Sequence, residues 1–226
     1  QRKNWSDFLD KKISEQFPDK NRNEIRILDM GAGPGFISII LAELGYKVTA
    51  ADATENMLKE AQINAGELSD KINFVKTDAE EPFFTEESFE VVFCRNLTWN
   101  LPHPEKAYES WLRLLTGRGM ILIFDANWYR YLYDEDKKKA YEEDRKAVAD
   151  KGLDDYNIGD NFDVMEDIAL LMPMSRRMRP QWDKEILTSL GASEIEITEN
   201  AGELLYSEKE KINYSSTPLF MIKAVK

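Results

Sequence analysis

The chain has 226 residues, of which 42% are hydrophobic and 32% are charged, and its formal net charge is −12. This composition is typical of a globular domain with a hydrophobic core, and it excludes a disordered chain. A surface this acidic repels polyphosphate, so nucleic acid is not expected as a partner.

A helical arm, residues 1–20, is predicted first, because Trp5, Phe8, Leu9 and Ile13 recur with helical spacing. Residues 24–127 then alternate short apolar segments with amphipathic ones. The apolar segments are typical of strands buried on both faces and cover residues 25–30, 47–52, 72–76, 91–95 and 120–125. Helices are predicted between them over residues 35–44, 55–66 and 104–115. Such alternation indicates a parallel sheet covered by helices.

After Asp125 this alternation stops, and residues 128–180 are helical in pattern. We interpret them as an insertion, or lid, between the fifth and sixth strands. Residues 181–226 are interpreted as a closing helix and two strands, over 194–198 and 219–225. The expected fold is therefore one α/β domain of residues 1–226, with a doubly wound, mostly parallel seven-stranded sheet and helices on both faces. Residues 24–127 form its cofactor-binding half.

Three features of the insertion have two interpretations each. The charged stretch of residues 134–151 is interpreted as the solvated face of a helix, with a protein contact as the alternative. Methionines with helical spacing are interpreted as core, with a deformable lid as the alternative: Met165, Met172, Met174 and Met178. Three arginines near the end of the insertion are interpreted as a solvated tail of a helix: Arg176, Arg177 and Arg179. The alternative is that they bind a carboxylate or phosphate of the acceptor.

The strongest local motif is a glycine-rich turn, Asp29-Met-Gly-Ala-Gly-Pro-Gly35, between a predicted strand and a predicted helix. Glycines permit positive φ and a close approach of backbone to ligand, and the following helix offers free N–H groups. A dinucleotide fingerprint would have its third glycine at position 36, where this chain has Phe36. The turn alone is weak evidence, because structural turns look similar.

Acidic residues follow three neighbouring strands of the predicted sheet. Asp29 precedes the glycines, Asp52 ends the second strand and Asp78 follows the third. Carboxyl ends of parallel strands form the ligand-binding edge of an open α/β sheet. A carboxylate at position 29 would repel a pyrophosphate but suits an ammonium group, and Asp52 is placed to accept from ribose hydroxyls. The three acids favour a cationic nucleoside over NAD or ATP.

The ordered motifs resemble those of the class I S-adenosylmethionine-dependent methyltransferases of the small-molecule type. They comprise the glycine turn, Asp52-Ala-Thr-Glu-Asn-Met57, Thr77-Asp78-Ala79, Phe89-Glu-Val-Val-Phe-Cys-Arg95 and the segment of residues 108–119. The resemblance covers residues 24–125 strongly and the closing strands weakly. It implies S-adenosyl-L-methionine as cofactor and S-adenosyl-L-homocysteine as product.

Site residues are assigned by this resemblance. Asp29 would orient the ammonium of the cofactor, Asp52 and Ala53 would lie at its ribose, Met57 would pack on adenine, and Asp78 with Ala79 would read the adenine edge. The turn residues Gly31, Ala32, Gly33 and Gly35 would pack on the methionine part. The floor near the sulfonium would be formed by Cys94, Arg95 and Asn96. The alternatives are loop acids for Asp29 and Asp52, and core packing for Met57 and Cys94.

Acceptor-side residues are predicted around the ends of the fourth and fifth strands. Trp99, Asn127, Trp128 and Tyr129 would supply apolar walls with polar tips, or would only dock the insertion. His103 is the one candidate base, although an exposed loop histidine is the simpler interpretation. No metal site is predicted.

The predicted reaction is transfer of a methyl group, by in-line displacement, to O, N or S of a small-molecule acceptor. Because the sulfonium methyl is already activated, holding the acceptor atom in line at roughly 3–3.5 Å from the methyl carbon can supply much of the catalysis. A non-catalytic cofactor-binding scaffold or regulatory module is the alternative, and a nicotinamide-dependent oxidoreductase is disfavoured by Phe36 and Asp29.

The expected location is cytoplasmic. Residues 1–10 are polar and contain no secretory signal, and Cys94, the only cysteine, cannot form a disulfide within the chain. No apolar run reaches the roughly 20 residues of a membrane-spanning helix, so no membrane partner is expected. The chain lacks an initiator Met, so a few native residues are expected to precede it. A monomer and a homodimer both remain open.

Overall fold

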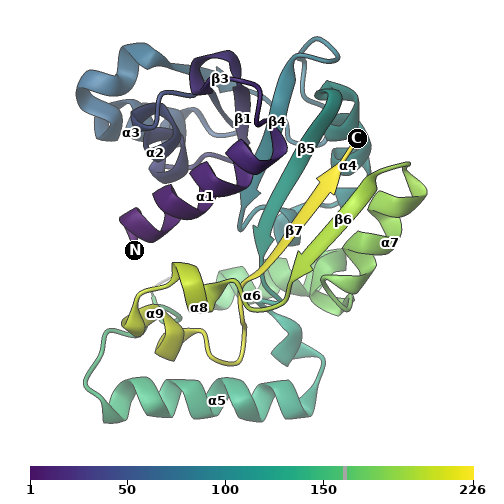
Figure 1. The fold of residues 1–226 in the computed structure, drawn as a ribbon. Helices are drawn as coiled ribbons and strands as arrows, with labels where there is room; N and C mark the ends of the chain where they lie inside the picture. The colour runs from purple at the N-terminus through teal and green to yellow at the C-terminus, as the bar shows by residue number, and fades with distance from the viewer. Residues whose placement is uncertain (160–161) are drawn as a thin grey trace.

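The computed structural model describes residues 1–159 and 162–226, and its centre is one seven-stranded sheet in the order β3-β2-β1-β4-β5-β7-β6 (Figure 1). The first five strands pair in parallel, and β7 is antiparallel to both β5 and β6. Their bounds are β1 Arg26–Met30, β2 Lys47–Asp52, β3 Ile72–Lys76, β4 Phe89–Arg95, β5 Leu115–Asp125, β6 Ser193–Thr198 and β7 Phe220–Val225. The predicted doubly wound, mostly parallel fold is confirmed.

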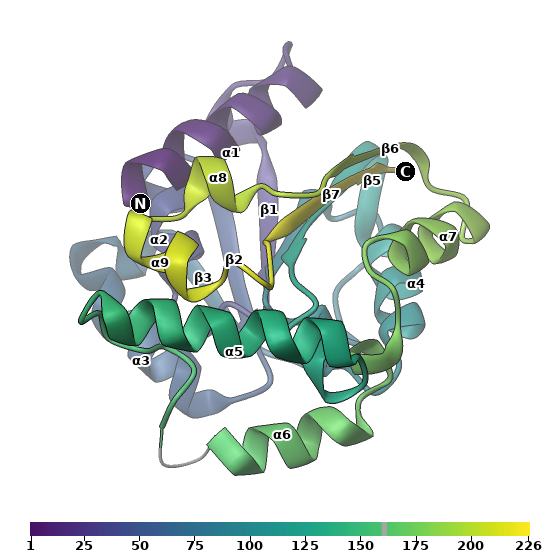
Figure 2. The same ribbon diagram turned by 90° about the horizontal axis from the view of Figure 1, so that it is seen from below.

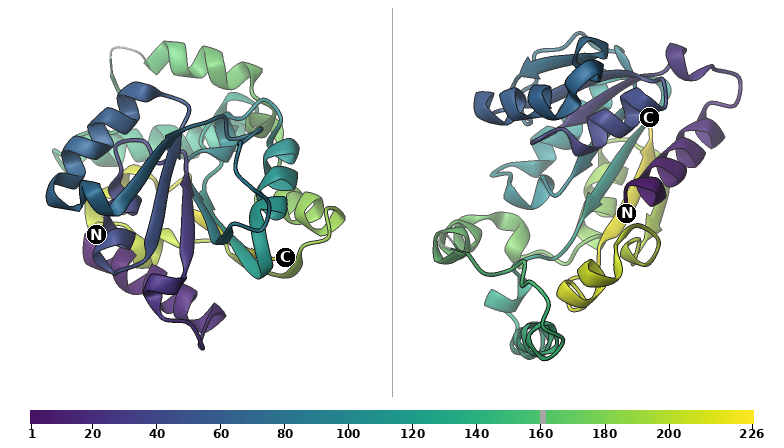
Figure 3. Two further views of the ribbon diagram at one scale, coloured as in Figure 1. Left: turned by 90° about the horizontal axis from the view of Figure 1, so that it is seen from above. Right: turned by 90° about the vertical axis from the view of Figure 1, so that its left-hand side faces the viewer.

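Helices cover both faces of this sheet, as Figure 3 shows from two sides. One face carries α1 (Arg2–Gln16), α2 (Phe36–Glu43) and α3 (Glu55–Ala65), and the other carries α4 (Pro104–Leu114) and α7 (Gln181–Ser189). Each layer buries its own apolar cluster against the sheet. Short 3-10 helices connect these elements at Arg22–Glu24, Gly66–Lys71, Thr98–Asn100, Arg130–Leu132 and Pro173–Arg176.

Helix α1 belongs to the main core. Trp5, Leu9 and Ile13 are at most 1% exposed, and the Trp5 ring meets Phe124 of β5 edge to face, with the centroids 4.9 Å apart. The amphipathic helix expected from the spacing therefore forms, and it seals one face of the sheet at β5.

The insertion lies beyond the carboxyl ends of the parallel strands (Figure 2). It contains α5 (Glu135–Asp150) and α6 (Phe162–Leu171) and joins β5 to α7. Two short helices form in the β6–β7 connection: α8 (Gly202–Leu205) lies beside α1, and α9 (Glu208–Asn213) lies beside α5. They were not predicted, since neither is long enough to show a helical period. No helix among the described residues has both the length and the apolar character to cross a membrane.

The interpretation of the insertion methionines as core is wrong for most of them. Met174 is buried, but Met165 and Met172 are half-buried and Met178 is 64% exposed. The physical reason is that α6 lies at the molecular surface, where Ala169 is its buried residue, and that Met172 and Met178 lie in the connections after this helix.

Candidate active site

The strand order places the predicted acids in a row along one edge of the sheet. Asp78 follows β3, Asp52 ends β2, and Asp29 lies in β1 just before the glycine turn. The row continues with Asn96 after β4 and Asp125 at the end of β5. Sequence reasoning therefore placed these groups correctly at the carboxyl edge, where open α/β sheets bind ligands.

The glycine turn between β1 and α2 requires its glycines. Gly31, Gly33 and Gly35 have φ of 70°, 53° and 86°, a region that other residues rarely adopt. A Cβ on Gly31 would lie 2.9 Å from the Leu97 side chain, and one on Gly35 would lie 2.9 Å from the Ala61 Cβ. The turn thus lies close to the loop after β4 on one side and to helix α3 on the other.

Asp52 faces the glycine turn. Its Oδ2 accepts a hydrogen bond from the Gly33 N–H at 3.0 Å, and its Oδ1 accepts one from the Thr54 N–H at 2.8 Å. The side chain is half-buried, and the neighbouring Ala53 is exposed. Met57, in the first turn of α3, is 39% exposed, so the alternative of core packing does not apply to it.

Asp78 and Ala79 lie where the third strand ends. Asp78 is exposed, and its Oδ1 accepts from the Glu80 N–H at 2.8 Å. Ala79 is buried, and its carbonyl accepts from the indole N–H of Trp111 on α4 at 2.9 Å. The sheet core therefore fixes the backbone at this position, while the acid faces solvent.

A buried acid and a half-buried cation lie beside the turn. Asp29 is 2% exposed, and its Oδ2 accepts from the Ser38 hydroxyl at 2.5 Å. Burial raises the pKa of Asp29 to about 6, although the Ser38 hydrogen bond and the Arg95 charge act to lower it. The Arg95 guanidinium lies 5.4 Å from the Trp5 ring centroid and 5.2 Å from that of Phe36. The Asp29 carboxyl and the Arg95 guanidinium interact electrostatically, and such a pair of opposite charges suits a zwitterion such as an amino acid.

A cavity of about 300 Å³, here called the aromatic cavity, lies over the ends of β4 and β5. It contains the predicted wall residues Trp99, Trp128 and Tyr129, and the Trp99 and Tyr129 rings are 5.0 Å apart. The remaining lining residues are Asn96, Tyr131, Asn157, Phe162 and Tyr214. Of these, only Asn96 was assigned to the site from sequence, because the others come from the insertion and the β6–β7 connection.

Asn127 joins the end of β5 to the insertion. Its amide pairs with the backbone of Arg179: Nδ2 donates to the Arg179 carbonyl at 2.9 Å, and Oδ1 accepts from the Arg179 N–H at 3.3 Å. Asn127 lines a second cavity of about 280 Å³ between the insertion, including α5, and the start of β7. It is not among the described residues that line the aromatic cavity. These hydrogen bonds fit the alternative interpretation, in which Asn127 docks the insertion, and its role as a wall of the acceptor site stays a prediction.

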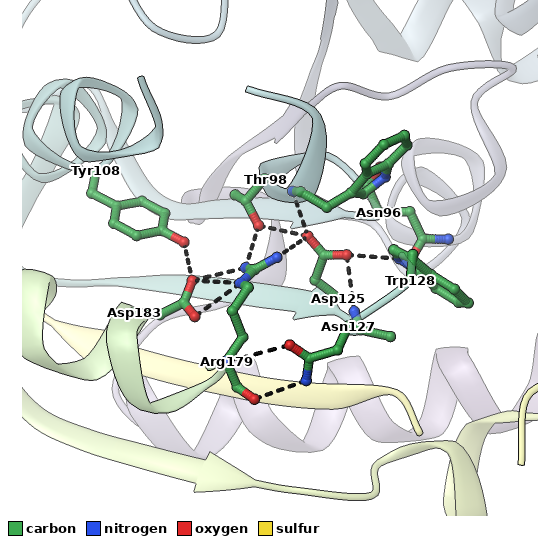
Figure 4. A network of polar contacts seen from close by, with 10 residues as sticks. Asn96, Thr98, Tyr108, Asp125, Asn127, Trp128, Arg179 and Asp183 are labelled. Carbon is green, nitrogen blue, oxygen red and sulfur yellow. Dashed lines mark hydrogen bonds and ion pairs between the residues drawn. The ribbon is translucent and has the colours of Figure 1, made fainter. Parts of the chain in front are cut away.

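The interpretation of Arg179 as part of a solvated tail is wrong. Its side chain is 1% exposed, donates to Asp125 Oδ2 at 2.9 Å and donates to Asp183 Oδ1 at 2.8 Å (Figure 4). Burial alone would lower the pKa of Arg179, but the two carboxylates raise it well above its usual value. The residue is therefore a buried cation between two buried anions.

This network positions the aromatic cavity (Figure 4). Asp125 accepts from the Trp99 N–H at 3.0 Å and from the Trp128 indole at 2.9 Å. The hydroxyl of Thr98 donates to the same carboxylate at 2.6 Å, and Tyr108 donates to Asp183. Arg179 therefore ties the carboxyl end of the insertion to Asp125 at the end of β5, and the same carboxylate accepts hydrogen bonds from Trp99 and Trp128.

Two predicted residues lie away from the aromatic cavity. Cys94 is buried among core residues, and burial raises the pKa of its thiol well above the usual value, so its side chain contributes packing. His103 is exposed at the start of α4, where its backbone N–H donates to Glu80 at 2.5 Å. It is not among the described residues that line the aromatic cavity, and its role as a base stays a prediction.

Comparison with known proteins gives a consistent result. Residues 28–123 match the family model described as a methyltransferase domain. The demethylmenaquinone methyltransferase of Clavibacter sepedonicus is 38% identical over 99 residues, which are 43% of this chain and 40% of that protein. The ubiquinone biosynthesis O-methyltransferase of Rickettsia akari is 26% identical over 127 residues, which are 56% of this chain and 50% of that protein. The matches thus span about half the length of these relatives or less.

A solved structure extends the comparison of the fold. Phosphoethanolamine N-methyltransferase 2 of Haemonchus contortus, in complex with S-adenosyl-L-methionine, has a TM-score of 0.63 and 18% identity. The match covers 95% of this chain and 51% of that chain. At this identity the likeness concerns the fold alone.

The strand order and the acidic edge define a doubly wound α/β protein with a nucleoside-type site at the carboxyl ends of its strands. Residues 28–123 thus resemble a methyltransferase domain, and they lie within a sheet of this strand order.

Proposed function

We propose that the protein transfers a methyl group from S-adenosyl-L-methionine to O, N or S of a small-molecule acceptor by in-line displacement. The observation that carries this proposal is the row formed by Asp78, Asp52 and Asp29 around the glycine turn, which continues into the aromatic cavity. Asn96 connects the row to the cavity, because it follows β4 at this edge and lines the aromatic cavity, and the next residue, Leu97, packs close to Gly31.

The residues of the row fit the proposed cofactor in order. Asp78 would accept from the adenine amine, Asp52 from the ribose hydroxyls, and exposed Met57 would pack on the base. Asp29 would hold the ammonium, and the adjacent Arg95 would bind the carboxylate of the methionine part. When bound, the cofactor supplies the activated methyl group, and the protein supplies alignment and exclusion of water.

Calorimetry with S-adenosyl-L-methionine, S-adenosyl-L-homocysteine and NAD tests the site, and transfer of a labelled methyl group to metabolite pools tests the activity. We expect binding of both adenosyl ligands and label transfer to a small molecule. Tight binding without transfer to any pool would instead support a cofactor-binding regulatory module. Binding of NAD alone would contradict the proposal. A cytoplasmic location and a small-molecule partner are part of the same proposal.

Replacing Asp52 with alanine is expected to weaken binding of S-adenosyl-L-homocysteine by about 1–3 kcal/mol, because hydrogen bonds to the ribose are lost. Titration calorimetry measures this change. The matched control is Asp70→Ala, which removes an exposed acid just before β3, at the opposite edge of the sheet. Equal dissociation constants for wild type and Asp52→Ala would show that the ribose lies elsewhere.

Affinity for the cofactor is expected to decrease as the pH is lowered through about 6. Burial raises the pKa of Asp29 to about 6, so the carboxylate becomes neutral below that value and no longer attracts an ammonium group. The limiting slope is about tenfold in affinity per pH unit. Binding measured between pH 5 and pH 8 shows this dependence for wild type, and Asp29→Asn should bind weakly with little dependence on pH. An identical pH profile for the two proteins would contradict the role of Asp29.

A further inference from the structure

The aromatic cavity has an uncharged wall. None of the described residues that line it carries a formal charge at neutral pH, and six of them contribute aromatic rings: Trp99, Trp128, Tyr129, Tyr131, Phe162 and Tyr214. Burial raises the pKa values of Tyr129, Tyr131 and Tyr214, so these phenols remain protonated. The wall therefore offers no group that removes a proton from an acceptor near neutral pH.

The polar groups of three rings in the wall already have hydrogen-bond partners within the protein. The Trp99 indole N–H donates to the Asn96 carbonyl at 3.0 Å, and the Trp128 indole N–H donates to Asp125 at 2.9 Å. The Tyr131 hydroxyl donates to Glu166 at 2.6 Å. An acceptor thus meets ring surface at these three positions, and the free polar groups of the wall are neutral hydroxyls and amides.

The nearby formal charges also favour a cation. Glu166 forms no ion pair with any residue that the structure describes, and its charge lies at the edge of the Tyr131 ring. Arg145, close to Asn157, is paired with Asp155 and with the Asn213 carbonyl. Aromatic faces with this surrounding charge attract alkylated ammonium groups.

We propose that the aromatic cavity receives a tertiary or heteroaromatic amine, an inference that rests on the proposed methyltransferase function and adds the class of acceptor. The amine nitrogen forms a bond to the methyl carbon while the carbon–sulfur bond breaks and its electron pair stays on sulfur. The reacting form is the neutral amine: the positive charge moves from sulfur to nitrogen and no proton is released in this step. A heteroaromatic amine is neutral near neutral pH, and an alkyl tertiary amine gives its proton to water before the transfer, so the cavity itself needs no base. The rings stabilise that charge on either side of the transfer.

A matched pair of probes tests the cavity without relying on turnover. Choline and 3,3-dimethyl-1-butanol have the same shape, but only choline carries a quaternary nitrogen. With S-adenosyl-L-homocysteine bound, we expect choline to bind at least about tenfold more tightly than the neutral alcohol in calorimetry. Binding of the two probes with equal affinity would overturn the amine inference.

Variants of one ring identify where the preference arises. Trp99→Leu is expected to bring the ratio of the two dissociation constants towards one, whereas Trp99→Phe keeps a ring and most of the preference. Trp182→Leu is the control, because Trp182 packs near Tyr108 in the layer of α4 and α7 and is not among the described residues that line the aromatic cavity. A preference that survives Trp99→Leu and is lost in Trp182→Leu would contradict the assignment to this cavity.

Failure of this inference can be told from failure of the proposed function. If S-adenosyl-L-homocysteine binds and choline shows no preference, the methyltransferase proposal stands and the acceptor is not an amine. If the adenosyl ligand does not bind, the proposed function fails, and the probe pair measured on the protein alone still decides whether the cavity prefers cations. Label transfer to phenols but not to tertiary amines would also overturn the inference.

Discussion

Replacing Arg179 with methionine is expected to lower the free energy of unfolding by about 3–5 kcal/mol, because two carboxylates then remain buried without their counter-charge. Asp125 and Asp183 have fully buried side chains, and Arg179 is the cation that both of them contact in the described structure. Urea unfolding followed by far-ultraviolet circular dichroism measures the loss.

Two further variants separate the charge effect from loss of packing. Arg176→Met makes the same substitution at an exposed arginine that lies 5.0 Å from the Tyr133 ring, and it should cost about 1 kcal/mol or less. Adding Asp183→Asn to Arg179→Met removes one uncompensated charge and should recover part of the loss. A decrease below about 1 kcal/mol in the single variant would contradict the view that this ion pair fixes the insertion.

Replacing Trp5 with alanine is expected to cost about 3–5 kcal/mol, which is the usual loss for a large aromatic side chain removed from a core. Trp5 is 0% exposed and packs against Phe124 near the carboxyl end of β5. The same variant removes one of the two rings beside the Arg95 guanidinium. Affinity for the methyl donor should therefore fall together with stability, which calorimetry and urea unfolding can measure on the same sample.

The conservative variant Trp5→Phe provides the control, because it keeps an aromatic ring against Phe124 while reducing its size. It should lose less stability than Trp5→Ala and retain most of the affinity. If the alanine variant unfolds too readily for binding measurements, the phenylalanine variant still reports the contribution of the ring to Arg95. A loss of less than about 1 kcal/mol for Trp5→Ala would show that α1 is not part of the core.

The strands that carry the site were predictable because they are short apolar segments bounded by turn residues. β1 and β4 are buried along most of their length, whereas β3, at the edge of the sheet, is mostly half-buried or exposed. For β1, β2 and β3 the predicted and observed ends agree within one residue. Strand β5 begins at Leu115, five residues before the predicted start, because residues 116–119 contain two glycines and an exposed arginine and show no apolar pattern. The acids at the strand ends followed from the fold, since parallel strands bring their carboxyl ends to one edge.

The acceptor side was less predictable because its contacts are distant in the sequence. Arg179 follows two exposed arginines, and its partner Asp125 lies 54 residues earlier, so the local pattern indicated a solvated tail. The one local signal was Asp183, four residues later. Helices α8 and α9 were missed although Ser207 and Glu210 form a capping box, which is a recognisable signal for the start of a helix. Tyr214 follows α9, and so it was missed as well.

The position of β7 between β5 and β6 has a consequence for synthesis of the protein on the ribosome. Strand β6 is made before β7 but pairs only with it, so neither β6 nor the outer edge of β5 has a partner until residues 220–225 have emerged. Until then β5 presents an apolar row of unpaired backbone groups, which is the kind of edge that other chains can join. Demand for chaperones during translation is therefore expected to persist until these residues are released.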